Sequence, residues 1–277
     1  MQNNFPIGVF DSGLGGLIIL KELQKILPNE SFIYFGDTAH IPYGNKSQKS
    51  IQKYSKKIVQ FLNSQKVKLI VVACNSASSV AIDIIKDCAK SPLIDVISPA
   101  VKKACETTKN NQIGIIGTDA TISSGAYQNN IFKFNKKIKI LTQSCPLLVP
   151  IIEEGLYKHE IGLQAINLYL NSLKQSEIDT LILGCTHYPI MAKSIQNYLA
   201  PKISGLLNYK ENTIHIINSS AETATTVQEF LKNNKMENLN HNKKEDEYYV
   251  SDKTIRFHTI ANIFLNKKIN NINEIEL

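Results

Sequence analysis

Two cysteines in this sequence stand where a thiol could do acid–base chemistry. Cys74 follows the apolar run LIVVA and precedes Asn-Ser, and Cys185 follows TLILG and precedes Thr-His. Each pattern predicts a buried strand that ends at the thiol and a helix that begins just beyond it. The N–H groups of a helix N-terminus favour the thiolate and lower a thiol pKa from its usual value of about 8.5. For either cysteine alone, a buried structural thiol is the simpler interpretation.

The two cysteines occupy matching places in a weak internal repeat. Residues 69–76 (LIVVACNS) resemble residues 180–187 (TLILGCTH), and residues 7–13 (IGVFDSG) resemble residues 113–119 (IGIIGTD), in the same order along the chain. The repeat predicts two similar α/β lobes that each contribute one thiol. Two thiols facing one cleft suit a reaction in which one removes a proton and the other delivers a proton to the opposite face. That chemistry is racemisation or epimerisation, whereas a hydrolase needs one nucleophile and an oriented histidine.

The segment DSGLGG at residues 11–16 follows the first predicted strand and opens a helix. Its glycines let backbone N–H groups approach an anion. The spacing does not meet the G-x-G-x-x-G dinucleotide pattern, and Asp11 would repel a phosphate. Asp11 suits an ammonium group or a charge that tunes a neighbouring thiol. A plain strand-to-helix turn with a capping side chain is the alternative.

Three further polar positions follow predicted strands or apolar runs. Asp37 and the Pro42-Tyr43-Gly44 turn come after the second strand, where plain turn chemistry is the alternative interpretation. His187, two residues after Cys185, could stabilise that thiolate or shuttle its proton. Glu153 follows an apolar run and could reach the cleft, or it could be a solvated helix carboxylate.

Short apolar runs bounded by Gly, Pro, Asn or Ser alternate with longer helical patterns along the chain. The predicted strands are Ile7–Phe10, Ser31–Phe35, Leu69–Ala73, Asp95–Ile97, Ile113–Ile116, Ile138–Thr142, Thr180–Leu183, His215–Asn218 and Tyr248–Val250. The predicted helices are Leu17–Ile26, Ser47–Gln65, Ala77–Ala89, Pro99–Lys109, Glu160–Lys174, Tyr188–Tyr198, Ala221–Asn233 and Arg256–Leu265. This alternation predicts an α/β fold with mainly parallel sheets, whose sites lie at the carboxyl ends of the strands.

The repeat and the alternation together predict the domain organisation. The first lobe comprises residues 1–98 and 208–277, with the return near Leu206–Thr213, and the second lobe comprises residues 99–207. We expect the lobes to be related by a pseudo-twofold axis, with the active site in the cleft between them.

The composition excludes several classes of protein. The 277 residues carry a formal charge of +7, but Arg256 is the one arginine among 31 basic residues, which argues against specific nucleic-acid recognition. The five cysteines form no C-x-x-C pair, so neither a disulfide framework nor a zinc site is expected, and Cys88, Cys105 and Cys145 are interpreted as structural thiols. No run approaches a membrane span and no secretory signal is visible, so we expect a cytoplasmic protein without a membrane partner.

These residues resemble the cofactor-independent aspartate/glutamate family of amino-acid racemases. The resemblance extends over nearly the whole chain, and its motifs are residues 10–16 (FDSGLGG), 36–37 (GD), 42–44 (PYG), 73–78 (ACNSAS), 117–123 (GTDATIS), 150–155 (PIIEEG), 184–189 (GCTHYP), 248–252 (YYVSD) and 256–257 (RF). The segment GCTHYP is the most specific, because aspartate-type relatives carry an acidic residue where His187 stands. Ser76 stands where the family usually has threonine, which keeps the hydroxyl and loses a methyl contact.

The resemblance implies interconversion of L- and D-glutamate without pyridoxal phosphate or a metal, in a protein that assembles as a homodimer and supplies D-glutamate for peptidoglycan. In this family the cysteine at Cys74 acts on the D enantiomer and the cysteine at Cys185 on the L enantiomer. Asp11 and His187 assist their neighbouring thiols, and Glu153 supports the second side. Substrate contacts map to Asp11, Ser12, Tyr43, Gly44, Asn75, Ser76, Thr118, Thr121, Thr186 and His187.

Two other functions remain open on the sequence alone. An aspartate or hydantoin racemase would share the fold and change the substrate, and His187-Tyr188-Pro189 argues against it. A non-enzymatic protein that binds nucleic acid or another macromolecule would use the positive charge, and it would be indifferent to mutation of either cysteine.

Overall fold

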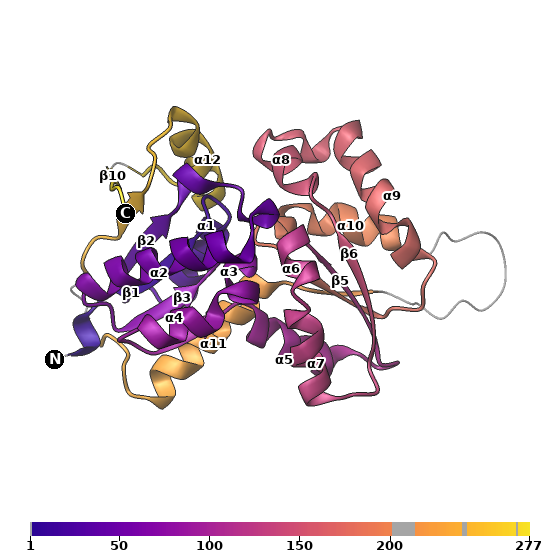
Figure 1. The fold of residues 1–277 in the computed structure, drawn as a ribbon, viewed down its shortest axis with the longest axis horizontal. Helices are drawn as coiled ribbons and strands as arrows, with labels where there is room; N and C mark the ends of the chain where they lie inside the picture. Colours follow the sequence, from indigo (N-terminus) through magenta and orange to yellow (C-terminus); the bar gives the residue numbers. More distant parts are fainter. Residues whose placement is uncertain (1, 201–213, 240–242, 270) are drawn as a thin grey trace.

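The computed structural model describes residues 2–200, 214–239, 243–269 and 271–277. These residues form two α/β lobes that lie side by side, each built around its own sheet (Figure 1). All neighbouring strands in both sheets are parallel, which confirms the predicted fold class.

The six-stranded sheet of the first lobe has the order β10-β9-β2-β1-β3-β4. Its strands are β1 (Ile7–Asp11), β2 (Phe32–Gly36), β3 (Leu69–Val72), β4 (Leu93–Asp95), β9 (Glu247–Val250) and β10 (Ile272–Glu274). Every residue of β1, β2 and β3 is buried, because helices cover both faces of a parallel sheet. The near-continuous apolar runs of the sequence arise from this burial.

The four-stranded sheet of the second lobe has the order β6-β5-β7-β8. Its strands are β5 (Gln112–Gly117), β6 (Lys139–Ser144), β7 (Thr180–Gly184) and β8 (His215–Ile217). The pairing of β8 with β7 corrects one part of the predicted organisation, which assigned residues 208–277 to the first lobe. A short apolar strand fits the edge of either sheet, and its partner is not visible in the sequence. The predicted return near 206–213 falls outside the described residues.

The helices connect the strands and cover the sheets (Figure 1). They are α1 (Gly16–Ile26), α2 (Gln48–Ser64), α3 (Asn75–Val80), α4 (Ile82–Cys88), α5 (Ile97–Thr107), α6 (Asp119–Ser123), α7 (Ala126–Phe134), α8 (Leu148–Glu153), α9 (Glu160–Lys174), α10 (Ala192–Leu199), α11 (Ser219–Asn233) and α12 (Ile255–Leu265). Single 3-10 turns include η3 (Tyr43–Asn45) and η5 (Tyr188–Met191). Helix α11 packs against both α1 and α5, so it joins the two lobes.

Three predicted elements differ from the structure. The helix predicted over Tyr188–Tyr198 begins as the 3-10 turn η5, and α10 begins only at Ala192. The helix predicted over Ala77–Ala89 is divided at Ala81, whose φ of −122° is not helical, and the Val80 carbonyl accepts a hydrogen bond from Gln52 Nε2 instead. The strand predicted over Asp95–Ile97 ends at Asp95. The Asp95 carboxylate accepts hydrogen bonds from the backbone N–H groups of Ile97 and Ser98, which starts α5 two residues before its predicted beginning.

A single apolar cluster of buried side chains extends through both lobes. It includes Leu20 of α1, Val227 of α11 and Leu183 of β7. The two lobes therefore share part of their hydrophobic core. Close packing in this shared core holds the two sheets in a fixed position relative to each other.

Candidate active site

The carboxyl ends of the two sheets position every predicted site residue. On the first lobe these residues are Asp11 and Ser12 after β1, Tyr43 and Gly44 after β2, and Cys74, Asn75 and Ser76 after β3; on the second lobe they are Thr118 and Thr121 after β5, Glu153 at the end of α8, and Cys185, Thr186 and His187 after β7. Parallel strands bring their carboxyl ends to one edge, so each lobe presents one polar edge.

The first thiol lies at the start of α3. Cys74 Sγ accepts a hydrogen bond from the backbone N–H of Ala77 at 3.4 Å and donates to Ser12 Oγ at 3.6 Å. The side chain is 4% exposed, and this burial, with the charge of Asp11, raises the pKa of the Cys74 thiol to about 12. The sequence predicted a lowered pKa at this helix N-terminus. Burial outweighs the N–H groups of so short a helix, and Cys74 is a protonated thiol at neutral pH.

Asp11 lies near enough to the first thiol for its charge to act on it, and it is almost completely buried. Its Oδ2 accepts a hydrogen bond from the backbone N–H of Gly13 at 2.9 Å, and its Oδ1 has no hydrogen-bond partner within the described parts of the chain. Burial raises the pKa of Asp11, and the nearby His187 and backbone N–H groups oppose this increase. The carboxyl group is thus placed to exchange a proton near Cys74.

The second thiol begins a chain of three polar groups. Cys185 Sγ lies 4.0 Å from His187 Nδ1, and His187 Nε2 lies 3.0 Å from Glu153 Oε1. Burial alone would lower the pKa of His187, but hydrogen bonding to Cys185 and Glu153 outweighs it and raises the pKa to about 10. The second thiol therefore lies next to a protonated imidazole, whereas the first lies near the carboxyl group of Asp11.

The two polar edges meet through small residues. Ser76 Oγ lies 3.0 Å from Thr118 Oγ1, which joins the first lobe to the second. A Cβ added at Gly44 would lie 2.8 Å from Thr118 Cβ, and one added at Gly15 would lie 2.0 Å from Thr186 Oγ1. Glycine is required at both positions because the opposite lobe approaches the backbone so closely.

Two of the predicted substrate contacts have buried side chains that are hydrogen-bonded to neighbouring residues. Thr121 is 0% exposed and its hydroxyl accepts a hydrogen bond from Thr118 Oγ1 at 3.0 Å. The Tyr43 hydroxyl donates to Asp37 Oδ2 at 2.5 Å, so its side chain is engaged within the first lobe. Its neighbour Gly44, and not Tyr43, lines the cavity between the lobes.

A cavity of about 290 Å³ opens between the lobes. Its lining comprises Ile41, Pro42, Gly44 and Asn45 from the first lobe and Thr118, Asp119, Pro146, Val149, Pro150 and Glu153 from the second. Both thiols are about 5% exposed or less, and neither belongs to this lining. The cavity has a size that suits a small molecule rather than a macromolecule.

Comparisons with known proteins agree with this geometry. The sequence profile of the Asp/Glu/Hydantoin racemase family matches residues 16–207, well over half of the chain. The chain belongs to this family. It is therefore an isomerase of the amino-acid racemase type, as the sequence predicted.

Three relatives of this racemase illustrate how far the similarity extends. A glutamate racemase of Geobacter metallireducens is 37% identical over 98% of this chain and 96% of its own length. Glutamate racemase 3 of Caldanaerobacter subterraneus is 40% identical over 97% of this chain and 94% of its own length. The crystal structure of a Francisella tularensis glutamate racemase in complex with D-glutamate superposes with a TM-score of 0.90, at 39% identity over 99% of this chain and 98% of that one.

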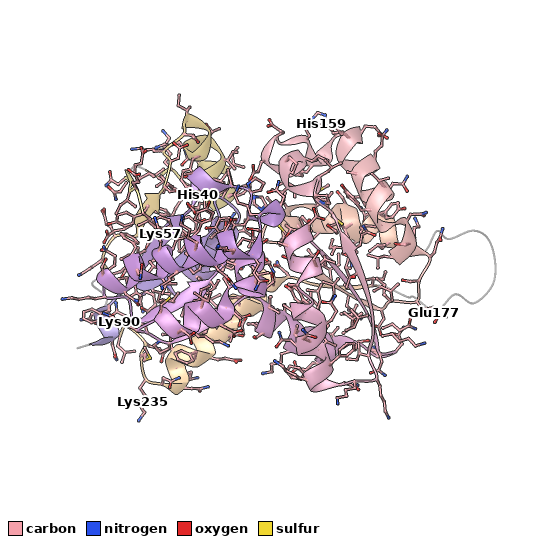
Figure 2. All side chains as sticks on the ribbon, in the orientation of Figure 1. His40, Lys57, Lys90, His159, Glu177 and Lys235 are labelled. Carbon is pink, nitrogen blue, oxygen red and sulfur yellow. The ribbon has the colours of Figure 1, made fainter. Side chains whose placement is uncertain are left out.

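The structure of this racemase also shows polar partners that the sequence left uninterpreted. Asp37, for which turn chemistry was the alternative, accepts hydrogen bonds from Tyr43 and Ser251 and pairs with His40 at 2.8 Å. His40 lies on the first lobe in Figure 2. The Asn75 amide reaches Tyr127, a residue no motif singled out, because a tyrosine in a helical pattern normally indicates packing.

Charged side chains lie on the outer faces of both lobes. The labelled Lys90, Lys235 and Glu177 lie on the outer faces of the two lobes in Figure 2, and all three are exposed. Within the described residues, His, Cys, Asp and Glu side chains form no group of three or more that could hold a metal ion. No helix in the described part of the chain is both long and apolar enough to cross a membrane.

Proposed function

We propose that this racemase interconverts L- and D-glutamate by proton transfer between Cα and two thiols, without a cofactor. The observation that carries the proposal is the pair Cys74 and Cys185. Each is buried at the carboxyl end of a strand, one in each lobe, and each has its own acid–base partner. One protonated thiol and one thiolate are what a two-base racemisation requires before it starts.

In the L-to-D direction, Cys185 is the base. The thiolate, paired with the protonated His187, takes the proton from Cα, so that the Cα–H bond breaks and an S–H bond forms. The electron pair left on Cα then takes the proton of the Cys74 thiol from the opposite face. The product leaves with Cys185 protonated and Cys74 as a thiolate.

The D-to-L direction runs the same steps in reverse and starts from the state that an L-to-D turnover leaves. Before a second turnover in the same direction, Cys185 must lose its proton and Cys74 must regain one. Asp11 lies next to Cys74 and has a raised pKa, and His187 contacts Cys185. These two groups provide proton exchange on each side of the cleft. Asp11 and His187 are therefore general acid–base partners of the thiols, and Glu153 holds His187 in its protonated form.

The hydrogen at Cα of an amino acid is a very weak acid, so the site must stabilise the carbanion as it forms. Hydroxyl groups lie near both thiols: the partly buried Ser12 accepts a hydrogen bond from Cys74, and the buried Ser76 and Thr186 lie within two residues of a thiol in the chain. In a site that excludes water, such fixed dipoles stabilise developing charge strongly. The same groups bind the two carboxylates of the substrate without the help of arginine. This is consistent with a chain that contains a single arginine.

Glutamate is the proposed substrate because the relatives that match nearly the whole chain are glutamate racemases, and one of them was crystallised with D-glutamate. His187 supports the same choice, because aspartate-type relatives carry an acidic residue at this position. An aspartate or hydantoin racemase of the same fold is the alternative. We further propose that the D-glutamate supplies peptidoglycan synthesis, that the chain acts as a homodimer, and that it works in the cytoplasm, where thiols stay reduced.

The test is a racemisation assay with purified protein, reducing agent and no added cofactor. We expect the circular dichroism of L-glutamate to decay to zero, and faster than that of L-aspartate. A flat trace with glutamate would reject the proposed function, and a faster decay with aspartate would favour the alternative. Salt-dependent DNA binding by a protein without racemase activity would instead support the macromolecule-binding hypothesis.

Cysteine variants test the two-thiol mechanism separately. Cys74→Ala and Cys185→Ala should each abolish turnover. In deuterated water, Cys185→Ala should lose α-proton exchange mainly from L-glutamate, and Cys74→Ala mainly from D-glutamate. Cys105→Ala, which removes a partly buried thiol of α5, is the control and should keep both activities. Wild-type exchange from both enantiomers in both active-site variants would contradict the mechanism.

A further inference from the structure

Tyr127 makes a hydrogen bond from the second lobe to the first. It lies on α7 and is 1% exposed, and its hydroxyl accepts a hydrogen bond from Asn75 Nδ2 at 2.8 Å. Asn75 is the first residue of α3 and directly follows Cys74. The contact therefore joins α7 to the residue next to the first thiol.

The bond leaves the other end of the Asn75 amide available. Asn75 is 3% exposed, and its Oδ1 has no hydrogen-bond partner among the residues that the structure describes. An asparagine amide offers donors at one end and an acceptor at the other, and rotation by half a turn exchanges them. A fixed partner on Nδ2 keeps the amide in one orientation.

The ring of Tyr127 also contacts the strand that carries the second thiol. A Cβ added at Gly184 would lie 3.2 Å from Tyr127 Cε2. Gly184 is the last residue of β7 and directly precedes Cys185. One buried side chain thus contacts the neighbour of each thiol, through its hydroxyl on one side and its ring edge on the other.

We propose that Tyr127 is a positioning residue for the racemase reaction. It acts through Asn75: the hydroxyl fixes the orientation in which the amide meets the substrate, and the ring holds α7 against the strand end that precedes Cys185. This inference rests on the proposed function, since Asn75 is a substrate contact only if that function holds. Tyr127 itself does not touch the reacting atoms.

The variant Tyr127→Phe removes the hydroxyl and keeps the ring that packs on Gly184, so the fold is preserved. We expect KM for both enantiomers to rise about 3- to 10-fold, the range that the loss of one hydrogen bond gives, with a smaller change in kcat. The matched control is Tyr248→Phe. The Tyr248 hydroxyl accepts an amide hydrogen bond from Gln24 at 3.3 Å within the first lobe, and KM should not change.

A double-mutant cycle with Asn75→Ala separates positioning from a general effect on packing. If Tyr127 acts through Asn75, adding Tyr127→Phe to Asn75→Ala leaves KM where Asn75→Ala alone puts it. Thermal unfolding of every variant verifies that it is folded. A wild-type KM in Tyr127→Phe, or a full additional increase in the Asn75→Ala background, would overturn the inference. Failure of the wild-type chain to racemise glutamate would reject the proposed function instead.

Discussion

The variant Glu153→Gln tests the electrostatic chain behind the second thiol. Glu153 Oε1 lies 3.0 Å from His187 Nε2, and the two side chains are 19% and 8% exposed. A hydrogen bond to a charged group contributes about 1.5–3 kcal/mol, and one pKa unit corresponds to about 1.4 kcal/mol. A negative partner stabilises the protonated imidazole, so its removal lowers the pKa of His187 by about 1–2 units.

The lowered pKa of His187 changes the pH profile in one direction. Wild-type His187 has a pKa of about 10 and keeps its proton up to that pH. In Glu153→Gln it loses the proton between about pH 8 and 9, and the thiolate of Cys185 loses its cationic partner. The Cys74 thiol has a pKa of about 12, so its own ionisation does not obscure this alkaline limb.

The measurement is kcat/KM for L-glutamate followed by circular dichroism from about pH 6 to about 10.5, because this ratio reports the pKa values of the free enzyme. The control is Glu160→Gln, which removes the same charge from an exposed position at the start of α9. We expect the alkaline limb to move down by about 1–2 units in Glu153→Gln only. An alkaline limb that coincides with the wild type would refute the role of Glu153.

Three further variants test the packing of the site and of the first lobe. In Gly15→Ala, the new methyl group overlaps Thr186 Oγ1 at 2.0 Å, so racemase activity should fall at least about 100-fold in a protein that remains folded by circular dichroism. In Asp37→Asn, loss of a buried charged acceptor should lower the free energy of unfolding by about 1–3 kcal/mol in urea and raise KM. In Lys68→Met, Glu30 loses its partner at 2.6 Å, which should destabilise the chain by about 3–5 kcal/mol while activity in the remaining native protein is unchanged.

The sequence predicted the parts of the site that depend on local pattern. A strand that ends in a thiol and a helix that follows it occur at Cys74, as the alternation of apolar runs and polar segments indicated. The run before Cys185 is likewise the buried strand β7. These features depend on the residues within a few positions of each thiol, so they can be predicted from the sequence alone.

The direction of side chains could not be predicted in the same way. The Tyr43 hydroxyl points to Asp37, which itself depends on Ser251 from the far end of the chain. The hydroxyl of Tyr127 meets Asn75 across the lobes. Such contacts join residues distant in sequence, and neither spacing nor composition carries information on them.

The pKa of the Cys74 thiol could not be predicted from the local sequence either. A position before a helix favours a thiolate at Cys74, and this local effect is readable from the sequence. The degree of burial and the position of Asp11 come from the tertiary fold, and together they raise the pKa instead. The local rule failed here because the desolvation of the charged form is the larger effect.

The strand order of the first sheet has a consequence for the growing chain on the ribosome. Strand β2 is paired on one side by β1 and on the other by β9, whose residues are synthesised only after the whole second sheet. Until residues 247–250 emerge, the apolar strand Phe32–Gly36 is an open edge that can pair with another nascent chain. The sheet that holds the first thiol is thus the first to begin and the last to be completed.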